Sequence, residues 1–267
     1  MHPILHVFGL DIAAYPLFAL LGALAAFITA LPALRCVGLH PVQVAWLLAA
    51  MCAGYLIGAR LWNAAVSPES FRGALQWYTP RLTGLSMYGG VLGAGLVLTA
   101  ALRLYKRPVW PALDGMTVPG CAAFCIARVG CFLNGCCTGR ATDCALGVVF
   151  PSKAAAQEAI SSLLPFLPAE RAVHPTQLYE PAGASLGLPL AVLLCKGLRL
   201  RQGALFLLYS AWFSAVRLAV LPLRVLPYSK AVKTVVYPFI YLLVTAVGIG
   251  LTAARGRQKV NEAGGSK

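Results

Sequence analysis

The segment AAYPLFALLGALAAFITALPAL, residues 13–34, contains no charged side chain from one end to the other. A helix needs roughly 20 apolar residues to cross a hydrocarbon core about 30 Å thick. The run is too long for the core of a signal peptide, and no A-x-A cleavage pattern follows it. We therefore predict a membrane-spanning helix here and not a cleaved leader.

The rest of the chain repeats this pattern. Of its 267 residues, 59% are hydrophobic and 11% are charged, against about 25% charged in soluble domains. We expect an all-α, polytopic membrane protein that forms a single domain over residues 1–267. Its seven spans are predicted at about 13–34, 42–64, 84–104, 110–133, 176–196, 203–221 and 235–253. In the loop region between the fourth and fifth spans, the apolar piece AISSLLPFL (159–167) is a candidate for a short interfacial helix.

The positive charge of the chain reports topology. A net charge of +14 without a soluble basic module argues against a nucleic-acid partner. Lysine and arginine are densest at one set of alternate loops and the C-terminal tail: Arg35; Arg103, Lys106 and Arg107; Lys196, Arg199 and Arg201; Arg255, Arg257, Lys259 and Lys267. Because such loops face the cytoplasm, we predict an external N-terminus, a cytoplasmic C-terminus and a periplasmic loop region after the fourth span.

Three arginines lie inside predicted spans at one depth. Arg60, Arg128 and Arg217 each fall near the outer end of a span, about 6–8 Å below its boundary. Spans one, three and five bring further polar side chains to this level: Tyr15, Tyr88 and Glu180. Each arginine alone could reach the interface by snorkelling. Together they favour a cationic pocket for an anion, of which phospholipid phosphate is the most available, and the arginine fork suits phosphate.

Six motifs in order carry a resemblance to a known family. They are IGARLWNAAV (57–66), LTGLSMYGGVLGA (82–94), ARVGCFLNGCCTGR (127–140), VVFP (148–151), HPTQLYE (174–180) and FSAVR (213–217). With these motifs the chain resembles the prolipoprotein diacylglyceryl transferases of bacterial inner membranes. The chain departs from the family pattern at several positions: Tyr88 replaces a histidine, Ala127 a glycine, Cys131 an asparagine, Cys136 a glutamate and Leu221 an acid.

The resemblance implies a reaction. Phosphatidylglycerol would donate its diacylglyceryl group to the lipobox cysteine of a precursor lipoprotein, forming a thioether and releasing glycerol phosphate without a cofactor. The predicted catalytic residues are Arg128, Arg217, Tyr88 and His174. The predicted substrate-binding residues are Tyr15, Arg60, Gly89, Gly90, Asn134, Gly135, Gly139, Arg140, Gln177 and Glu180. The alternative is a retasked or non-catalytic phospholipid-binding membrane protein with the same fold, which the changes at Tyr88, Cys136 and Leu221 favour.

Several residues keep more than one interpretation. Cys131, Cys136 and Cys137, with Cys144 further on, are metal ligands, disulfide partners or small packing residues; the spacing differs from paired zinc ligands, so we favour packing and expect no metal. Asn134-Gly135 and Gly139 predict turns that bring backbone N–H groups near a phosphate. His174 is either a helix-entry residue or a proton carrier, and Glu180 either a partner of the arginines or a base. Tyr88 is expected to donate a hydrogen bond to phosphate.

Overall fold

The computed structural model describes residues 4–7, 10–68, 85–150, 172–226 and 228–256. Within these ranges, seven helical segments are long and apolar enough to cross a membrane. Their helices are α1 (Ala14–Cys36), α2 (Pro41–Val66), α3 (Met87–Leu104), α4 (Val109–Asn134), α6 (Thr176–Gly197), α7 (Ala204–Val220) and α8 (Tyr237–Arg255). The predicted all-α, seven-span membrane fold is confirmed. The segment AISSLLPFL lies outside the described residues.

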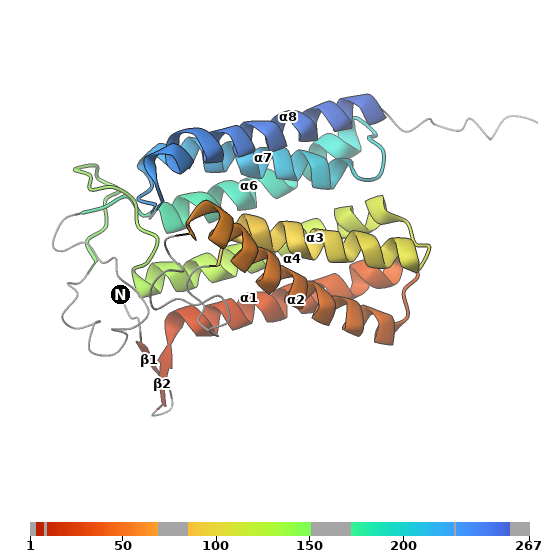
Figure 1. Ribbon diagram of the computed structural model, residues 1–267, viewed down its shortest axis with the longest axis horizontal. Helices are drawn as coiled ribbons and strands as arrows, with labels where there is room; N and C mark the ends of the chain where they lie inside the picture. Colours follow the sequence, from red (N-terminus) through yellow and green to blue (C-terminus); the bar gives the residue numbers. More distant parts are fainter. Residues whose placement is uncertain (1–3, 8–9, 69–84, 151–171, 227, 257–267) are drawn as a thin grey trace, which may run out of the picture.

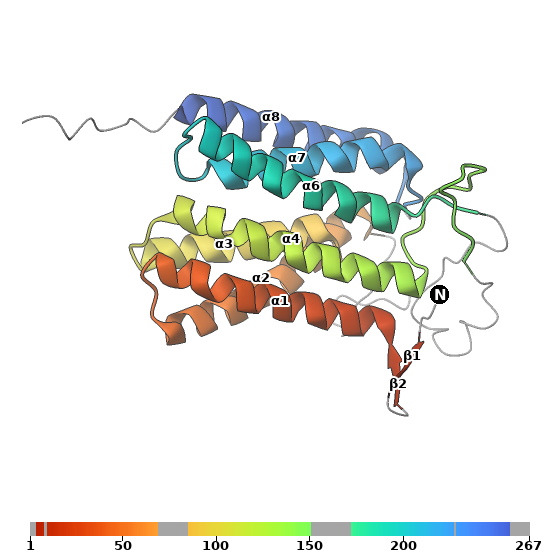
Figure 2. The ribbon, with the colours of Figure 1, turned by 180° about the vertical axis from the view of Figure 1, so that it is seen from behind.

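The helices run side by side along the long axis of the molecule (Figures 1 and 2). Helix α1 packs on α4, α2 packs on α3, and α7 packs between α6 and α8. Contacts between α4 and α6 join the first of these three sets to the third. The C-terminus of α4, the N-terminus of α6 and the loop segments 135–150 and 172–175 all lie at one end, on the left in Figure 1. We call this the loop end, and the other the opposite end.

Two short helices extend the last two spans. The 3-10 helix η2 (Leu221–Leu223) continues α7, and the π-helix η3 (Val232–Val236) leads into α8. Pro222 stands near the start of η2 and lacks the backbone N–H that a continuing α-helix would use. The chain therefore leaves the axis of α7 at the loop end, which determines where the next residues lie.

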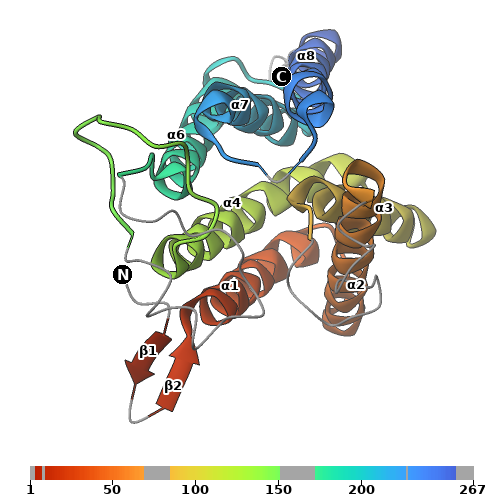
Figure 3. The same ribbon diagram turned by 60° about the vertical axis from the view of Figure 1, so that its left-hand side comes forward.

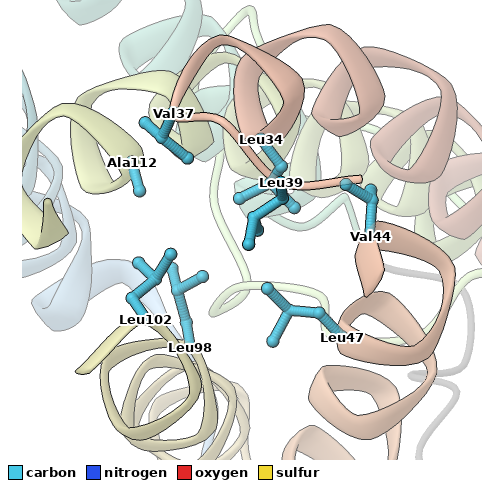
Figure 4. Close-up of a cluster of buried hydrophobic side chains, with 8 residues drawn as sticks. All are labelled: Leu34, Val37, Leu39, Val44, Leu47, Leu98, Leu102 and Ala112. Carbon is cyan, nitrogen blue, oxygen red and sulfur yellow. The ribbon is translucent and has the colours of Figure 1, made fainter. Parts of the chain in front are cut away.

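A hydrophobic cluster closes the opposite end of the bundle (Figure 4). It joins the turn between α1 and α2 to the end of α3 and the start of α4. Its buried members are Leu34, Val37, Leu39, Val44, Leu47, Leu98, Leu102 and Ala112. Large apolar side chains such as Leu20, Trp46 and Leu186 lie instead on the outer surface. Such an apolar exterior suits contact with acyl chains, since a membrane helix need not hide its apolar face.

Glycines bring α2 and α3 into direct backbone contact. A Cβ at Gly89 would stand 2.2 Å from the carbonyl oxygen of Gly58, and one at Gly93 would stand 2.2 Å from that of Gly54. Small residues that let helix backbones approach are typical of membrane interfaces. The structure thus gives Gly89 a packing role, and contact between this glycine and a substrate stays a prediction.

A β-hairpin precedes α1 and was not predicted. Strands β1 (Ile4–Val7) and β2 (Leu10–Ala13) pair antiparallel, and Figure 3 shows them projecting from the start of α1. Alternation of apolar and polar residues marks a strand only over 4–8 residues. Strands of four residues each, next to a long apolar run, are too short for this pattern to stand out.

Candidate active site

Three arginines converge on one carboxylate at the loop end. Glu180, in the second turn of α6, is only 1% exposed. Its Oε2 lies 2.5 Å from Arg128 Nη2, on α4, and 2.7 Å from Arg217 Nη1, on α7. Its Oε1 accepts a hydrogen bond of 2.5 Å from Arg224 Nη1, just beyond η2. The structure therefore brings together Arg128, Arg217 and Glu180, as the shared depth predicted, and adds Arg224.

The centre has excess positive charge. Three guanidinium groups, which stay protonated in proteins, face one carboxylate, so the net charge is about +2. The arginine side chains are 8–11% exposed. Burial, and then the neighbouring Arg217, lower the pKa of the Arg224 guanidinium below its ordinary value. The Nε atoms of Arg217 and Arg224 have no hydrogen-bond partner in the described part of the chain, and so can donate to a bound anion.

Sequence reasoning missed Arg224. Arg224 lies beyond the predicted sixth span, which ends at residue 221, whereas the shared-depth argument considers only arginines inside spans. The chain turns back at η2, and Arg140 N–H donates to Leu223 O at 2.8 Å while Gly139 and Arg224 form an isolated bridge. The available signal was the proline at position 222, which predicts a change of direction at the end of the span.

The chain reverses direction directly after α4. Gly135 is left-handed, with a φ of 69°, and its N–H donates to Phe132 O at 3.1 Å. Cys136 N–H donates to Cys131 O at 3.1 Å. This pair of bonds is a Schellman motif, which satisfies the last carbonyl groups of a helix. The predicted Asn-Gly turn is present, and it folds the segment 135–141, which we call the signature loop, back over the end of α4.

The signature loop is tied to the entry of α6. Gly139 N–H donates to His174 O at 2.8 Å, and His174 N–H donates to Arg140 O at 3.0 Å. A Cβ at Gly139 would stand 2.6 Å from Leu223 O, so any other residue there would force the backbone to shift. The amides of Gly135, Gly139 and Arg140 are thus engaged within the protein. The predicted turns are present, and the prediction that their N–H groups lie near a bound phosphate stays a prediction.

The first turn of α6 holds the signature loop with side chains. Thr176 Oγ1 donates to Cys137 O at 2.9 Å, and Gln177 Nε2 donates to Cys136 O at 2.8 Å. Gln177 is fully buried, and its Oε1 has no partner among the described residues. Neither has Nδ2 of buried Asn134, at the end of α4. The motif HPTQLYE therefore supplies both the side chains that hold the signature loop and Glu180, the carboxylate that the arginines contact.

Tyr88 lies beside Arg217, as the shared-depth prediction requires. The Arg217 guanidinium stands over the Tyr88 ring at 5.6 Å and over the Tyr241 ring at 6.0 Å. The rings of Tyr88 and Tyr241 are 5.4 Å apart. The Tyr88 hydroxyl is buried and has no hydrogen-bond partner in the described chain. This tyrosine can therefore both fix the arginine and donate a hydrogen bond nearby.

Four other predicted site residues have contacts of their own. The His174 Nδ1 is 3.4 Å from the hydroxyl of Tyr179. Gly90 packs on the ring of Tyr55, and Arg60 is half-buried on α2. Their roles in binding or proton transfer stay predictions. Tyr15, at the start of α1, is an electrostatic neighbour of three cysteines, which are Cys131, Cys136 and Cys137.

Those three cysteines form a cluster. Their sulfur atoms all lie within 4.8 Å of one another. All nine cysteines of the chain lie in its described part, and all are free thiols. The disulfide interpretation therefore has no bond in this structure. Three sulfur atoms at this spacing could also hold a metal ion, an interpretation that the sequence analysis ranked below simple packing.

Comparison with known families agrees with the motifs. The model of the family described as prolipoprotein diacylglyceryl transferase matches residues 3–254. The chain belongs to this family. The resemblance inferred from the motifs is thereby confirmed, and the arginine centre lies on three of the motifs that carry it, ARVGCFLNGCCTGR, HPTQLYE and FSAVR.

Several relatives of this diacylglyceryl transferase family are named phosphatidylglycerol–prolipoprotein diacylglyceryl transferase. One from Anaplasma marginale (strain Florida) is 30% identical over 226 residues, which cover 81% of this chain and 73% of the relative. One from Clostridium tetani is 29% identical over 185 residues, covering 67% and 68%. One from Thermus thermophilus is 34% identical over 175 residues, covering 61% of each.

Proposed function

We propose that this chain transfers the diacylglyceryl group of phosphatidylglycerol to the cysteine thiol of a precursor lipoprotein, forming a thioether and releasing glycerol phosphate. Its family and the names of its relatives support a transferase with these two substrates. The observation that carries the proposal is the convergence of Arg128, Arg217 and Arg224 on Glu180. A buried site with this excess of arginine is built for an anion that can reach it from the membrane.

The charge of the site fits the leaving group better than the substrate. The phosphodiester of phosphatidylglycerol carries one negative charge, whereas a phosphate monoester carries about 1.5 to 2 at neutral pH. A centre with net charge of about +2 therefore binds the departing glycerol phosphate more strongly than the intact lipid. Only interactions that strengthen toward the transition state accelerate the reaction, and these arginines meet that condition.

The transfer step follows from this arrangement. The thiolate of the acceptor attacks the glyceryl carbon, and an S–C bond forms as the C–O bond to phosphate breaks. The electron pair goes to the phosphate oxygen, where Arg128, Arg217 and Arg224 stabilise it. A donor placed on a developing oxyanion contributes roughly 3–4 kcal/mol. Glu180 keeps the three guanidinium groups together, since without it they would repel one another in a buried site.

Two further donors lie at this end of the bundle. The Tyr88 hydroxyl and Asn134 Nδ2 are both buried and have no hydrogen-bond partner among the described residues. Each can donate to an oxygen of the lipid headgroup. His174, for which a helix-entry role and a proton-carrier role were both left open, has its ring beside Tyr179.

We also propose the setting of the site. The single domain of residues 1–267 lies in the bacterial inner membrane with its N-terminus outside the cytoplasm, so the loop end faces the periplasm. The distribution of lysine and arginine over the loops supports this orientation. A cysteine introduced by His2→Cys should react with a membrane-impermeant thiol reagent added from outside. Labelling of that position only after the cytoplasmic face is opened would reverse the orientation.

The function is tested with purified protein, phosphatidylglycerol and a peptide that contains a lipobox cysteine. We expect the peptide to gain the mass of one diacylglyceryl group, and equimolar glycerol phosphate to appear. A peptide with serine in place of the cysteine is the control and should stay unmodified. Binding of phosphatidylglycerol without any modified peptide would contradict transfer and favour a phospholipid-binding protein that has lost the reaction.

A further inference from the structure

We propose that Cys131, Cys136 and Cys137 form a three-thiolate site for a soft divalent metal ion, zinc first, with its fourth position open to the acceptor thiol. The second half of this inference rests on the proposed function, whereas the metal site stands by itself. Three observations support the metal site: the positions of the three sulfur atoms, the hydrogen bonds that fix their backbone, and the arginines beside them.

The local fold brings the three sulfur atoms together. Cys131 lies in the last turn of α4, and the Schellman turn at Gly135 folds Cys136 back over it, with the Cys136 thiol donating to Cys131 O at 3.7 Å. Cys137 follows in a left-handed conformation, with a φ of 60°. This conformation is uncommon for a residue with a side chain and costs about 1–3 kcal/mol. The site therefore depends on the turn at Gly135 and not on the regular spacing of a zinc motif.

The distances suit a tetrahedral thiolate site. Zinc binds sulfur at about 2.3 Å, which places sulfur atoms roughly 3.8 Å apart around a tetrahedral ion. The three Sγ atoms all lie within 4.8 Å of one another. Small side-chain rotations therefore suffice to bring them to a common ion. Thiolate sulfur also selects zinc over harder ions such as Mg²⁺ and Ca²⁺.

The cluster is anchored on one side and open on the other. Hydrogen bonds from Thr176 and Gln177 fix the carbonyl groups of Cys137 and Cys136. Cys131 is buried, whereas Cys137 is exposed. Zinc sites with three protein ligands are catalytic in type, because their fourth position takes water or substrate. The exposed side at Cys137 is where a fourth ligand would enter.

The cluster borders the arginine centre. Cys131 follows Arg128 by three residues on α4, so their side chains lie on one face of the helix. Arg128 is an electrostatic neighbour of Cys131 and Cys137, and Arg224 of Cys137. Three thiolates on a divalent ion carry a net charge of about −1, which the excess charge of the arginines balances. A thiol at the ion and a phosphate at the arginines would therefore be adjacent.

The described site otherwise lacks a base for the acceptor thiol. Glu180 is committed to three arginines, and the ring of His174 contacts Tyr179. The Tyr88 phenol, whose ordinary pKa is near 10, is a poor base at neutral pH. A thiol that coordinates a divalent ion is deprotonated outright. The ion would thus supply the thiolate that these side chains do not.

The step balances. The three cysteines lose their protons when the ion binds, and the acceptor thiol loses its proton to solvent when it takes the fourth position. Its sulfur then attacks the glyceryl carbon, the C–O bond breaks, and the electron pair leaves with glycerol phosphate. The thioether product is neutral and a weaker ligand than a thiolate, so the ion releases it. No oxidant or reductant takes part.

Cobalt(II) tests the metal site without reference to catalysis. Full-length protein in detergent is reduced, freed of metal with a chelator and titrated with Co²⁺. We expect one equivalent to give the charge-transfer absorption of a tetrahedral cobalt thiolate, which Zn²⁺ then abolishes. Cys131→Ser, Cys136→Ser and Cys137→Ser should each weaken this absorption, while Cys144→Ser, a matched change at an exposed cysteine beyond the signature loop, should keep it.

The thiol step has its own readout. A lipobox peptide should change the cobalt absorption, and its serine analogue should not. Because a free thiol near pKa 8.5 is only a few per cent ionised at pH 7, removal of zinc from wild-type protein should slow transfer roughly 30-fold, and zinc should restore it. A peptide-dependent spectrum without transfer would contradict the proposed function alone. Wild-type protein that gives no cobalt thiolate absorption, or that transfers equally fast without metal, would overturn the inference, as would a reduced protein that only forms a disulfide among these cysteines.

Discussion

Each end of the bundle holds one carboxylate inside the protein, half-buried at Asp114 and fully buried at Glu180, and the two have different partners. At the opposite end, Asp114 of α4 accepts backbone N–H groups from Gly203 at 2.5 Å and from Phe206 at 2.9 Å. It thereby caps the N-terminus of α7, where a negative charge also interacts favourably with the helix dipole. At the loop end, Glu180 faces three arginine side chains instead.

This comparison distinguishes a charge that stabilises the fold, at Asp114, from charges that are available to a ligand, at the three arginines. The Asp114 carboxylate is satisfied by the backbone of a helix that it helps to position, so nothing at that site requires a ligand. The arginines share one carboxylate, and the Nε atoms of Arg217 and Arg224 have no partner within the described ranges. An excess of buried charge is unfavourable unless a ligand neutralises it. The loop end is therefore the end at which an anion is expected to bind.

Removal of the Glu180 charge should have the largest effect. Glu180→Gln leaves three buried guanidinium groups without a counter-charge, which should lower the free energy of unfolding by about 3–5 kcal/mol. Phosphatidylglycerol should raise the midpoint of thermal unfolding more in this variant than in wild type, because the lipid phosphate replaces the lost charge. Asp114→Asn is the matched variant at the opposite end and should show no such extra gain. If phosphatidylglycerol raised the unfolding midpoint equally in the two variants, the lipid would not bind preferentially at the loop end.

Changes of arginine to lysine sharpen the comparison through activity. Arg128→Lys and Arg217→Lys keep the charge and lose the planar fork, so each should reduce the transfer rate about 10²- to 10³-fold. Arg224→Lys should fall in the same range, although the sequence alone assigns it no role. Arg107 is exposed and lies at the opposite end of the bundle, so Arg107→Lys serves as the control. Its transfer rate should stay within about twofold of wild type. A loss at Arg107 as large as that at Arg128 would misplace the site.

Tyr88→Phe tests the hydroxyl beside Arg217. If that hydroxyl donates to the lipid phosphate, its removal should cost about 1–3 kcal/mol, a loss of 5- to 150-fold in transfer rate. The ring contacts with Tyr241 and Arg217 remain, so the thermal unfolding midpoint should change little. Full activity in this variant would leave Tyr88 only a packing role. A much higher activity in Tyr88→His would mean that the wild-type site lacks a base at this position.

The smallest expected effect concerns the shape of the signature loop. Gly139→Ala would place a Cβ against Leu223 O and His174 O, and the loop should shift at a cost of about 1 kcal/mol, the low end for overpacking. Gly120→Ala, on α4 with nothing near its added Cβ, should instead be neutral or stabilising. Transfer rates and unfolding midpoints of the two variants measure this difference. A harmless Gly139→Ala would show that the loop need not be held at α6.

The sequence predicts what depends on periodicity and depth. Seven apolar runs determine the spans, since each is long enough to cross a bilayer. Arg128, Arg217 and Glu180 could be brought to one site because each lies at a known distance from a span end. Gln177, in the first turn of α6, was also predicted to bind substrate, and in the structure it and Thr176 donate hydrogen bonds to the signature loop.

The missed features depend on how loops fold back. Arg224 reaches Glu180 only because the chain turns at η2 and pairs with the signature loop. The amides of Gly135 and Gly139 are used within the protein, and composition cannot reveal which partner an amide finds. The cysteine cluster had one usable signal, the Asn134-Gly135 pair at a helix end, because a left-handed glycine there folds the following residues back on the last turn.

The most direct test of the central claim is the binding of phosphatidylglycerol itself, measured without an acceptor peptide. Wild-type, Arg217→Gln and Arg107→Gln proteins are equilibrated with equal amounts of phosphatidylglycerol and phosphatidylcholine in detergent, and the retained lipids are identified by native mass spectrometry. The excess charge at the loop end predicts that wild type and Arg107→Gln retain phosphatidylglycerol in preference, and that Arg217→Gln, which removes one of these charges, loses most of the preference. Retention of the two lipids in equal amounts by wild type, or an unchanged preference in Arg217→Gln, would contradict the account.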